Sequence, residues 1–218
     1  MKNENMSIWI REARKQGIDL SAMYQDKLKI YDVLEILGLP TPKRYTLDPK
    51  EIENPWVEEI FRNNTYFCRL IPNDKEKTRP YKMRVTTKEE LKIFYEEQRG
   101  EYTIMLVEKG EVRYSGVIIA IEDGEEQRGV VELVKGDGED LAHGKKTPLH
   151  GKWEARRKIK YINQIPKKEE EQIIEQAIRA IGYPKAPFPG YYEFEVWKEN
   201  QIIFRNYQSP QTPYGKLP

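Results

Sequence analysis

Residues 102–134 read YTIMLVEKGEVRYSGVIIAIEDGEEQRGVVELV, and this stretch decides the fold class. It contains three runs that are rich in Val, Ile and Tyr, at 102–108, 112–122 and 129–134. Two short segments with a central glycine, at 109–111 and 123–125, join these runs. Runs of this length and composition, separated by such turns, are typical of consecutive antiparallel strands. We therefore expect an antiparallel meander in the middle of the chain.

Helices and further strands are expected on both sides of this meander. Segments 25–37 and 167–181 carry apolar residues at helical spacing and end at a glycine, and shorter helices are expected within 49–62 and from Thr87 to 98. Thr87 and Glu90 have the spacing of a capping box. The remaining strand candidates are 66–71, 81–86, 153–162, 191–197 and 202–207. Together these segments predict an α+β protein.

The composition excludes several classes of protein. The 37 basic and 36 acidic side chains leave a net charge of only +1, which is not the excess charge of a dedicated nucleic-acid binder. Dense, balanced charge is also typical of thermophile surfaces. The longest apolar run, 116–121, is far shorter than the ~20 residues of a membrane helix, and the N-terminus has no signal-peptide pattern. We expect a cytoplasmic protein, with the single Cys68 as a core residue.

Two chemical motifs are incomplete. Five residues separate Gly138 from Gly144, where a P-loop has four. Lys146 follows Lys145 at the position where a P-loop needs Ser or Thr. A glycine-rich loop that covers a ligand and a solvated hairpin loop both fit this segment. His143 and His150 are the only histidines, and no cysteine lies near them. A zinc site is therefore not expected, and both histidines are assigned to loops.

The acidic residues of the last hairpin form a better candidate site. Glu193 and Glu195 alternate along one strand, so their side chains project to the same face. Two carboxylates on one face could hold a hard cation whose shell is completed by water. A solvent-facing row that pairs with Lys198 and Arg205 explains the same residues, and both interpretations stay open.

A basic strand gives an alternative function. Segment 152–161 interleaves lysines and arginines with Trp153 and Tyr161, which could follow a phosphate backbone and stack on bases. An edge strand protected by lysine has the same composition. We favour the edge strand, and RNA binding remains the competing hypothesis.

Taken in chain order, these segments resemble an ATP-grasp domain, the fold that holds a nucleotide between two lobes. Residues 26–42, which end in Leu39-Pro40-Thr41-Pro42, are similar to the family's entry helix and the passage that follows it. Residues 66–72 are similar to its phosphate-binding strand, with Arg69 as the basic residue, as in the branch related to phosphoenolpyruvate synthase. Residues 105–108 resemble the hinge strand, and 192–208 resemble the metal-binding hairpin.

The resemblance implies ATP and Mg²⁺ as ligands and assigns roles to named residues. Phosphate charge would be neutralised by Arg69, with Lys27 and Arg84 as further cations. The adenine would bind at the hinge, at Leu106 and Glu108. The magnesium ligands would be Glu193, Glu195 and Asn206. The implied activity is Mg²⁺-dependent phosphoryl transfer or an ATP-dependent ligation.

The chain departs from the family pattern in two places. Asn206-Tyr207-Gln208 stands where the family has Glu-x-Asn, so a neutral amide replaces a carboxylate. Only about twenty residues precede the first helix, so we expect a nucleotide-binding module whose substrate site comes from a protein partner. A degenerate scaffold that binds nothing is the remaining alternative. The expected divisions are an extension at 1–20, lobes at 21–98 and 99–208, and a tail at 209–218.

Overall fold

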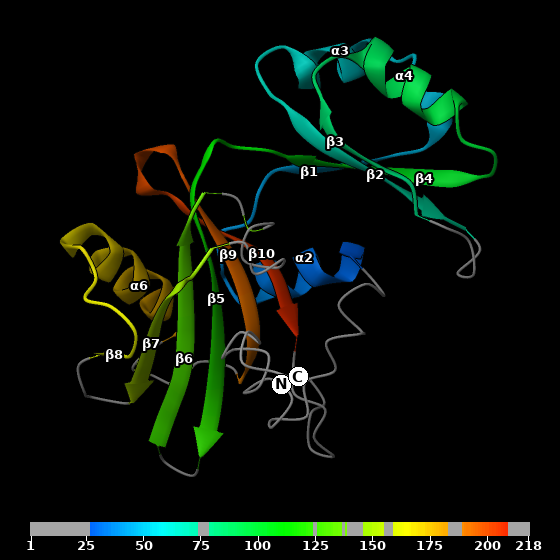
Figure 1. The fold of residues 1–218 in the computed structure, drawn as a ribbon. Coiled ribbons are helices and arrows are strands. Elements are labelled where there is room, and N and C mark those ends of the chain that lie inside the picture. Colours follow the sequence, from blue (N-terminus) through cyan, green and yellow to red (C-terminus); the bar gives the residue numbers. More distant parts are fainter. Residues whose placement is uncertain are drawn as a thin grey trace, which may run out of the picture. The chain divides into compact units, whose positions relative to one another are not determined.

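The computed structural model describes residues 27–73, 79–123, 126–136, 138, 146–154, 159–182 and 189–208 (Figure 1). The α+β class predicted from the sequence is confirmed by two antiparallel sheets with accompanying helices. The helices and short 3-10 turns are α2 (Lys27–Ile36), η2 (Pro49–Glu51), α3 (Pro55–Phe61), α4 (Lys88–Glu96), α6 (Lys168–Ala180) and η3 (Lys198–Asn200). The strands are β1 (Arg44–Leu47), β2 (Tyr66–Pro72), β3 (Tyr81–Val85), β4 (Tyr102–Glu108), β5 (Val112–Asp123), β6 (Glu126–Lys135), β7 (Leu149–Glu154), β8 (Lys160–Tyr161), β9 (Gly190–Trp197) and β10 (Ile202–Gln208). None of the helices in these ranges has both the length and the apolar composition of a membrane-spanning segment.

The chain divides into two compact units that differ from the boundaries expected from the sequence. Residues 42–110 form the small unit, and residues 1–41 with 111–218 form the large unit. Helix α2 belongs to the large unit because it packs against β10, where the N–H of Phe204 donates to the carbonyl of Pro40 at 2.8 Å. Strand β4 belongs to the small unit because it lies between β1 and β2.

The small unit is a four-stranded sheet with helices on one face. Its strand order is β1-β4-β2-β3, and all neighbours are antiparallel. Alternate residues of β2 are buried, so Tyr66, Cys68 and Leu70 pack against α3 and α4 in the core (Figure 1). The intervening residues of β2, including Arg69, therefore project from the face that these helices leave open.

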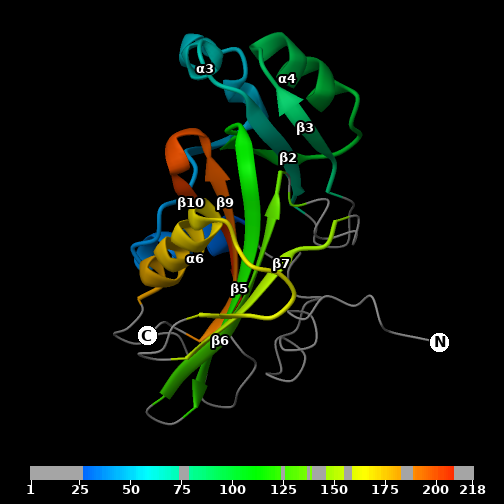
Figure 2. The same ribbon diagram turned by 60° about the vertical axis from the view of Figure 1, so that its left-hand side comes forward.

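The large unit is a six-stranded antiparallel sheet with the order β10-β9-β5-β6-β7-β8. Helix α6 lies along one of its faces (Figure 2). Tyr114 and Tyr161 identify this face, because the Tyr114 hydroxyl donates to Glu169 of α6 at 3.1 Å, and burial with nearby α6 glutamates raises the pKa of Tyr161 to about 12. The same alternation puts Phe194 and Phe204 under the helix. The residues between them project from the opposite face.

Two strand predictions are confirmed only in part. Strands β5 and β6 of the expected meander pair antiparallel, but β4 belongs to the other sheet, and the segment 109–111 connects two units. The expected strand at 153–162 corresponds to the end of β7, which begins earlier, at Leu149, and to β8 at Lys160–Tyr161, and residues 155–158 lie outside the described ranges. Turn composition alone does not reveal which sheet a strand joins.

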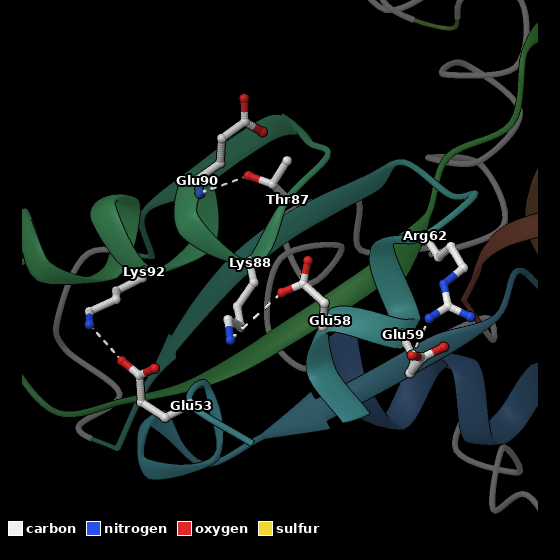
Figure 3. A network of polar contacts seen from close by, with 8 residues as sticks. All are labelled: Glu53, Glu58, Glu59, Arg62, Thr87, Lys88, Glu90 and Lys92. Atoms are coloured by element: carbon white, nitrogen blue, oxygen red, sulfur yellow. Dashed lines mark hydrogen bonds and ion pairs between the residues drawn. The ribbon is translucent and has the colours of Figure 1, made fainter. Parts of the chain in front are cut away.

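Helices α3 and α4 carry a cluster of polar contacts on the outside of the small unit (Figure 3). Lys92 donates to Glu53 at 2.5 Å, and Lys88 lies 3.6 Å from Glu58. Thr87 caps α4, and its hydroxyl accepts from the N–H of Glu90 at 3.1 Å. The N–H of Thr86 donates to the carboxylate of Glu90 at 2.8 Å. In the predicted capping box the N–H of Thr87 would be the donor, so the second bond of the box comes from the preceding residue.

Loss of the α4 cap should cost more than loss of an exposed ion pair. We expect Thr87→Ala to lower the free energy of unfolding by about 1 kcal/mol, because an N–H at the helix start loses its acceptor. Lys92→Met breaks the pair with Glu53 and should have a smaller effect, since both side chains are solvated. Urea unfolding of the two variants and the native chain tests this order. A larger effect from Lys92→Met would contradict it.

Cys68 should be inert in the native protein. Its side chain is fully buried, and burial raises the pKa of the thiol to about 12. Because the thiolate is the reactive species, a thiol reagent at pH 8 should leave the native chain unmodified and should label one cysteine after denaturation. Mass spectrometry measures the labelling, and rapid modification of the native chain would show that β2 opens readily.

Candidate functional site

Arg69 lies at the centre of the open face of the small sheet. The strand register places Met105 and Tyr81 on either side of it. Its guanidinium carbon lies 5.4 Å from the centre of the Phe67 ring, and the rings of Phe67 and Tyr81 are 5.9 Å apart. A planar cation supported by aromatic rings can form a two-pronged contact with phosphate oxygens. This face therefore places Arg69 against flat apolar groups, with Arg44 of β1 aligned with Val107 on the same face.

The other predicted nucleotide contacts are less favourably placed. Arg84 is exposed on β3 and alternates with the buried Val85, so it shares the open face with Arg69. Leu106 is fully buried and has strand partners on both sides, so its backbone belongs to the ladder. Glu108 lies at the end of β4, and its N–H donates to the carbonyl of Lys43 at 2.8 Å. Lys27 begins α2, and its side chain lies outside the described residues.

The face of the large sheet opposite α6 carries a row of polar residues. The register aligns Asn206 of β10 with Glu193 of β9, then Val117 of β5, Glu132 of β6 and His150 of β7. Residues aligned across antiparallel strands project to one face. We call this the polar face, defined by Asn206, Glu193, Glu132 and His150.

The two glutamates of β9 differ in how their carboxylates are engaged. Glu193 accepts a hydrogen bond from the hydroxyl of Tyr191. Glu195 accepts one from Nε1 of Trp197 at 2.8 Å, and Nε of Arg205 lies 3.7 Å away. The interpretation of these glutamates as a solvent-facing row that pairs with basic residues is therefore partly confirmed for Glu195, which lies near Arg205. It is wrong for Lys198, which pairs with Glu111.

Asn206 is the most unusual residue of the polar face. Its side chain is fully buried, and neither its amide nitrogen nor its amide oxygen has a hydrogen-bond partner in the structure. A bulge in β10 at Arg205 brings it opposite Glu193. A buried amide without partners costs about 1–3 kcal/mol, which makes Asn206 a candidate for contact with a bound ligand, ion or water.

The residues around Asn206 fit a magnesium ion better than a fully protein-bound metal. Within the described ranges, no group of three or more His, Cys, Asp and Glu side chains could hold a metal ion. Magnesium usually takes one or two protein carboxylates and keeps water or phosphate oxygens as its other ligands. Glu193, with its carboxylate oriented by Tyr191, and the amide oxygen of Asn206 form a set of that kind.

Sequence reasoning missed two members of the polar face. His150 was assigned to a loop but lies in β7, and its Nδ1 is 3.1 Å from the carboxylate of the fully buried Glu132. The signal was the single acidic residue inside the apolar run 130–134. The competing RNA-binding hypothesis had Trp153 stack on a base, but this side chain is only 2% exposed and lies on the face of the sheet that α6 covers. His143 lies outside the described residues.

The comparisons identify the fold. No protein-family model matches the sequence, and no curated protein does. The D-alanine-D-alanine ligase of Helicobacter pylori superimposes with a TM-score of 0.50 at 13% identity, over 90% of this chain and 57% of the ligase. The fold is ATP-grasp-like.

Other solved structures match with similar coverage. They include the N5-carboxyaminoimidazole synthase of Aspergillus clavatus in complex with ADP, at 11% identity and a TM-score of 0.49, over 91% of this chain and 49% of the enzyme. The D-alanine-D-alanine ligase of Coxiella burnetii matches at 15% identity with a TM-score of 0.48, over 87% of this chain and 48% of the ligase. The chain thus spans about half the length of the enzymes it resembles.

Replacing the unpartnered amide should stabilise the ligand-free protein. We expect Asn206→Leu to raise the free energy of unfolding by about 1 kcal/mol, because it removes buried polar atoms that have no partners. Ser115→Ala is the matched control on the same face. Its hydroxyl donates to the carbonyl of Gly136 at 2.8 Å, so its loss should lower stability by about 1 kcal/mol. Urea unfolding in buffer without Mg²⁺ or nucleotide measures both, and a destabilising Asn206→Leu would show that the amide is satisfied.

Proposed function

We propose that the chain binds Mg²⁺-ATP, with Glu193 and Asn206 as the protein ligands of the ion. The buried, unpartnered amide of Asn206 opposite Glu193 is the observation that carries this proposal. The ATP-grasp-like fold supports it independently. Glu195 contributes negative charge nearby, and its existing contacts with Trp197 and Arg205 make it the weaker ligand.

Arg69 binds the phosphates in this proposal. It is held over Phe67, and a guanidinium pairs with two phosphate oxygens at once. An arginine in this role would match the branch related to phosphoenolpyruvate synthase. Arg84 is an additional, more exposed cation on the same face. Leu106 and Glu108 remain candidate adenine contacts, and Glu108 would use its carbonyl oxygen or carboxylate because its N–H is already engaged.

The chemistry that follows is transfer of the terminal phosphoryl group to an acceptor, or a ligation driven by that transfer. Such reactions need positioning and neutralisation of charge more than covalent catalysis. Magnesium supplies charge neutralisation at the phosphate oxygens when it is bound. We propose that the acceptor is presented by a protein partner.

Variants of the two units should affect ATP binding in different ways. Arg69→Ala should lower affinity for ATP by about tenfold to a hundredfold with or without Mg²⁺, since charged hydrogen bonds contribute about 1.5–3 kcal/mol. Glu193→Gln should remove the Mg²⁺-dependent part of the affinity and leave binding of metal-free ATP unchanged. Isothermal titration and the thermal shift with Mg²⁺-ATP measure these effects.

Matched controls separate these effects from general changes of charge. Arg62→Ala removes an exposed arginine of the small unit, and Glu175→Gln removes an exposed carboxylate of α6. Both should leave ATP binding within about twofold of the native value. If the native chain shows no thermal shift with any nucleotide, the protein is a scaffold that retains the fold alone. If Arg69→Ala binds normally, Arg69 is not in the site.

A further inference from the structure

Residues 160–168 form a segment at the edge of the large sheet that is both basic and apolar. They read KYINQIPKK, with three lysines and no acidic residue, in a chain whose net charge is only +1. Strand β8 is the last strand of the sheet, and the chain runs from it to α6 at the left margin of Figure 1. We call residues 160–168 the basic loop. It lies at the opposite edge of the sheet from β9 and β10.

Two isoleucines of the basic loop project into solvent. Ile162 is 48% exposed, and Ile165 is 95% exposed, more than any other large apolar side chain in the described ranges. A single exposed apolar residue is ordinary on a protein surface. Two of them, three residues apart and flanked by lysines on both sides, form a surface that can contact an apolar and anionic partner.

The side chain of Asn163 holds the basic loop against β7. Its amide nitrogen donates to the carbonyl of Pro148 at 2.6 Å, and its amide oxygen accepts from the N–H of His150 at 3.0 Å. Pro166 restricts the backbone of Ile165 to extended conformations. The exposed isoleucine therefore sits on a loop whose conformation is already fixed, so binding costs little additional ordering.

Two lysines of the basic loop lie where the helix disfavours them. Lys160, Lys167 and Lys168 are all exposed. Lys167 and Lys168 begin α6, at the positive end of the helix dipole, where a cation is unfavourable. The glutamates at 169–171 follow in the first turn and offset part of this charge, although the first of them already pairs with Arg113. The stability of α6 therefore does not account for the two lysines.

The third lysine has acidic residues on its own face of the sheet, but these already face other basic groups. Lys160 shares this face with Glu132 and Glu154. Glu132 is buried 3.1 Å from Nδ1 of His150, and Glu154 lies opposite Arg128 in the register. An excess of positive charge thus remains at this edge of the sheet.

The exposed side chains of the basic loop fit a lipid surface better than a nucleic acid. Trp153 is only 2% exposed, and the hydroxyl of Tyr161 is buried, so neither ring is displayed for stacking on bases. Aliphatic side chains gain nothing from a phosphate backbone in water. Lysines around exposed aliphatic side chains are instead typical of proteins that lie on anionic membranes, where the cations approach the headgroups and the apolar groups enter the acyl boundary.

We propose that the basic loop is a docking surface for an anionic lipid membrane. Lys160, Lys167 and Lys168 attract the headgroups, and Ile162 and Ile165 insert at the boundary between headgroups and acyl chains. The chain would rest on the membrane at this edge of the large sheet without spanning it. This inference goes beyond the proposed function, because it requires neither ATP nor Mg²⁺.

Cosedimentation of the full chain with lipid vesicles tests the surface. The chain should bind vesicles made of equal parts of phosphatidylcholine and phosphatidylglycerol at low ionic strength, and pure phosphatidylcholine vesicles at least about tenfold more weakly. Lys160→Gln/Lys167→Gln/Lys168→Gln should lower the partition coefficient by about a hundredfold, at about fivefold per lysine. Ile162→Ser/Ile165→Ser should lower it by about tenfold or more, because the inserted apolar area is lost.

Matched variants control for net charge and for exposed apolar area. Lys43→Gln/Lys50→Gln/Lys92→Gln removes three exposed lysines of the small unit, and Ile36→Ser removes an isoleucine that is 80% exposed on α2. Both should change vesicle binding by less than about threefold. An environment-sensitive dye on Ile165→Cys should increase in emission with the anionic vesicles, and the same dye on Ile36→Cys should not.

Each outcome supports or overturns the membrane surface. Loss of binding in both basic-loop variants, with the dye response at position 165, supports it. A native chain that does not bind the anionic vesicles would overturn it, and so would an equal loss in the lysine control, which reduces the effect to net charge. Unchanged binding of Ile162→Ser/Ile165→Ser would also overturn it, because a surface that needs only charge fits a nucleic acid or an acidic protein equally well.

Discussion

The register of β9 between β5 and β10 is the constraint on which the large unit depends. It aligns Phe194 with Gly116 and Phe204, and Glu193 with Val117 and Asn206. Gly116 allows the alignment, because a Cβ there would lie 2.3 Å from the Phe194 ring. A slip by one residue would exchange the two faces, burying carboxylates under α6 and exposing aromatic rings. The packing of one face therefore fixes the position of the polar residues on the other.

The sequence predicted local structure better than the partnership of strands. The capping residue Thr87 and the apolar residues at helical spacing in segment 167–181 follow from short-range rules, and the structure has them. The grouping of β4 with β1 and β2 depends on contacts between residues that are far apart in sequence. A Gly-containing link such as 109–111 is compatible with a hairpin and with a connection between units. Only packing decides between them.

In the candidate site, too, the sequence predicted local features better than contacts between strands. Alternation alone placed Glu193 and Glu195 on one face, as the register has them. It could not show that Tyr191 and Trp197 each engage one of these carboxylates, or that a bulge at Arg205 brings Asn206 opposite Glu193. The bulge changes the face to which the following residues project, and the residue types of Phe204, Arg205 and Asn206 do not predict it. His150 was missed because its partner, Glu132, lies on another strand.

The replacement of a carboxylate by Asn206 need not weaken a magnesium site. A carboxylate at this position would stand directly opposite Glu193 and would add repulsion at a buried position. A neutral amide supplies an oxygen ligand without that repulsion, and its nitrogen can donate to a phosphate oxygen on the same ligand. An amide thus suits a site in which the metal arrives together with a polyanion. In the absence of that ligand the same amide is a source of instability, which is the arrangement expected where binding and not stability determines the residue.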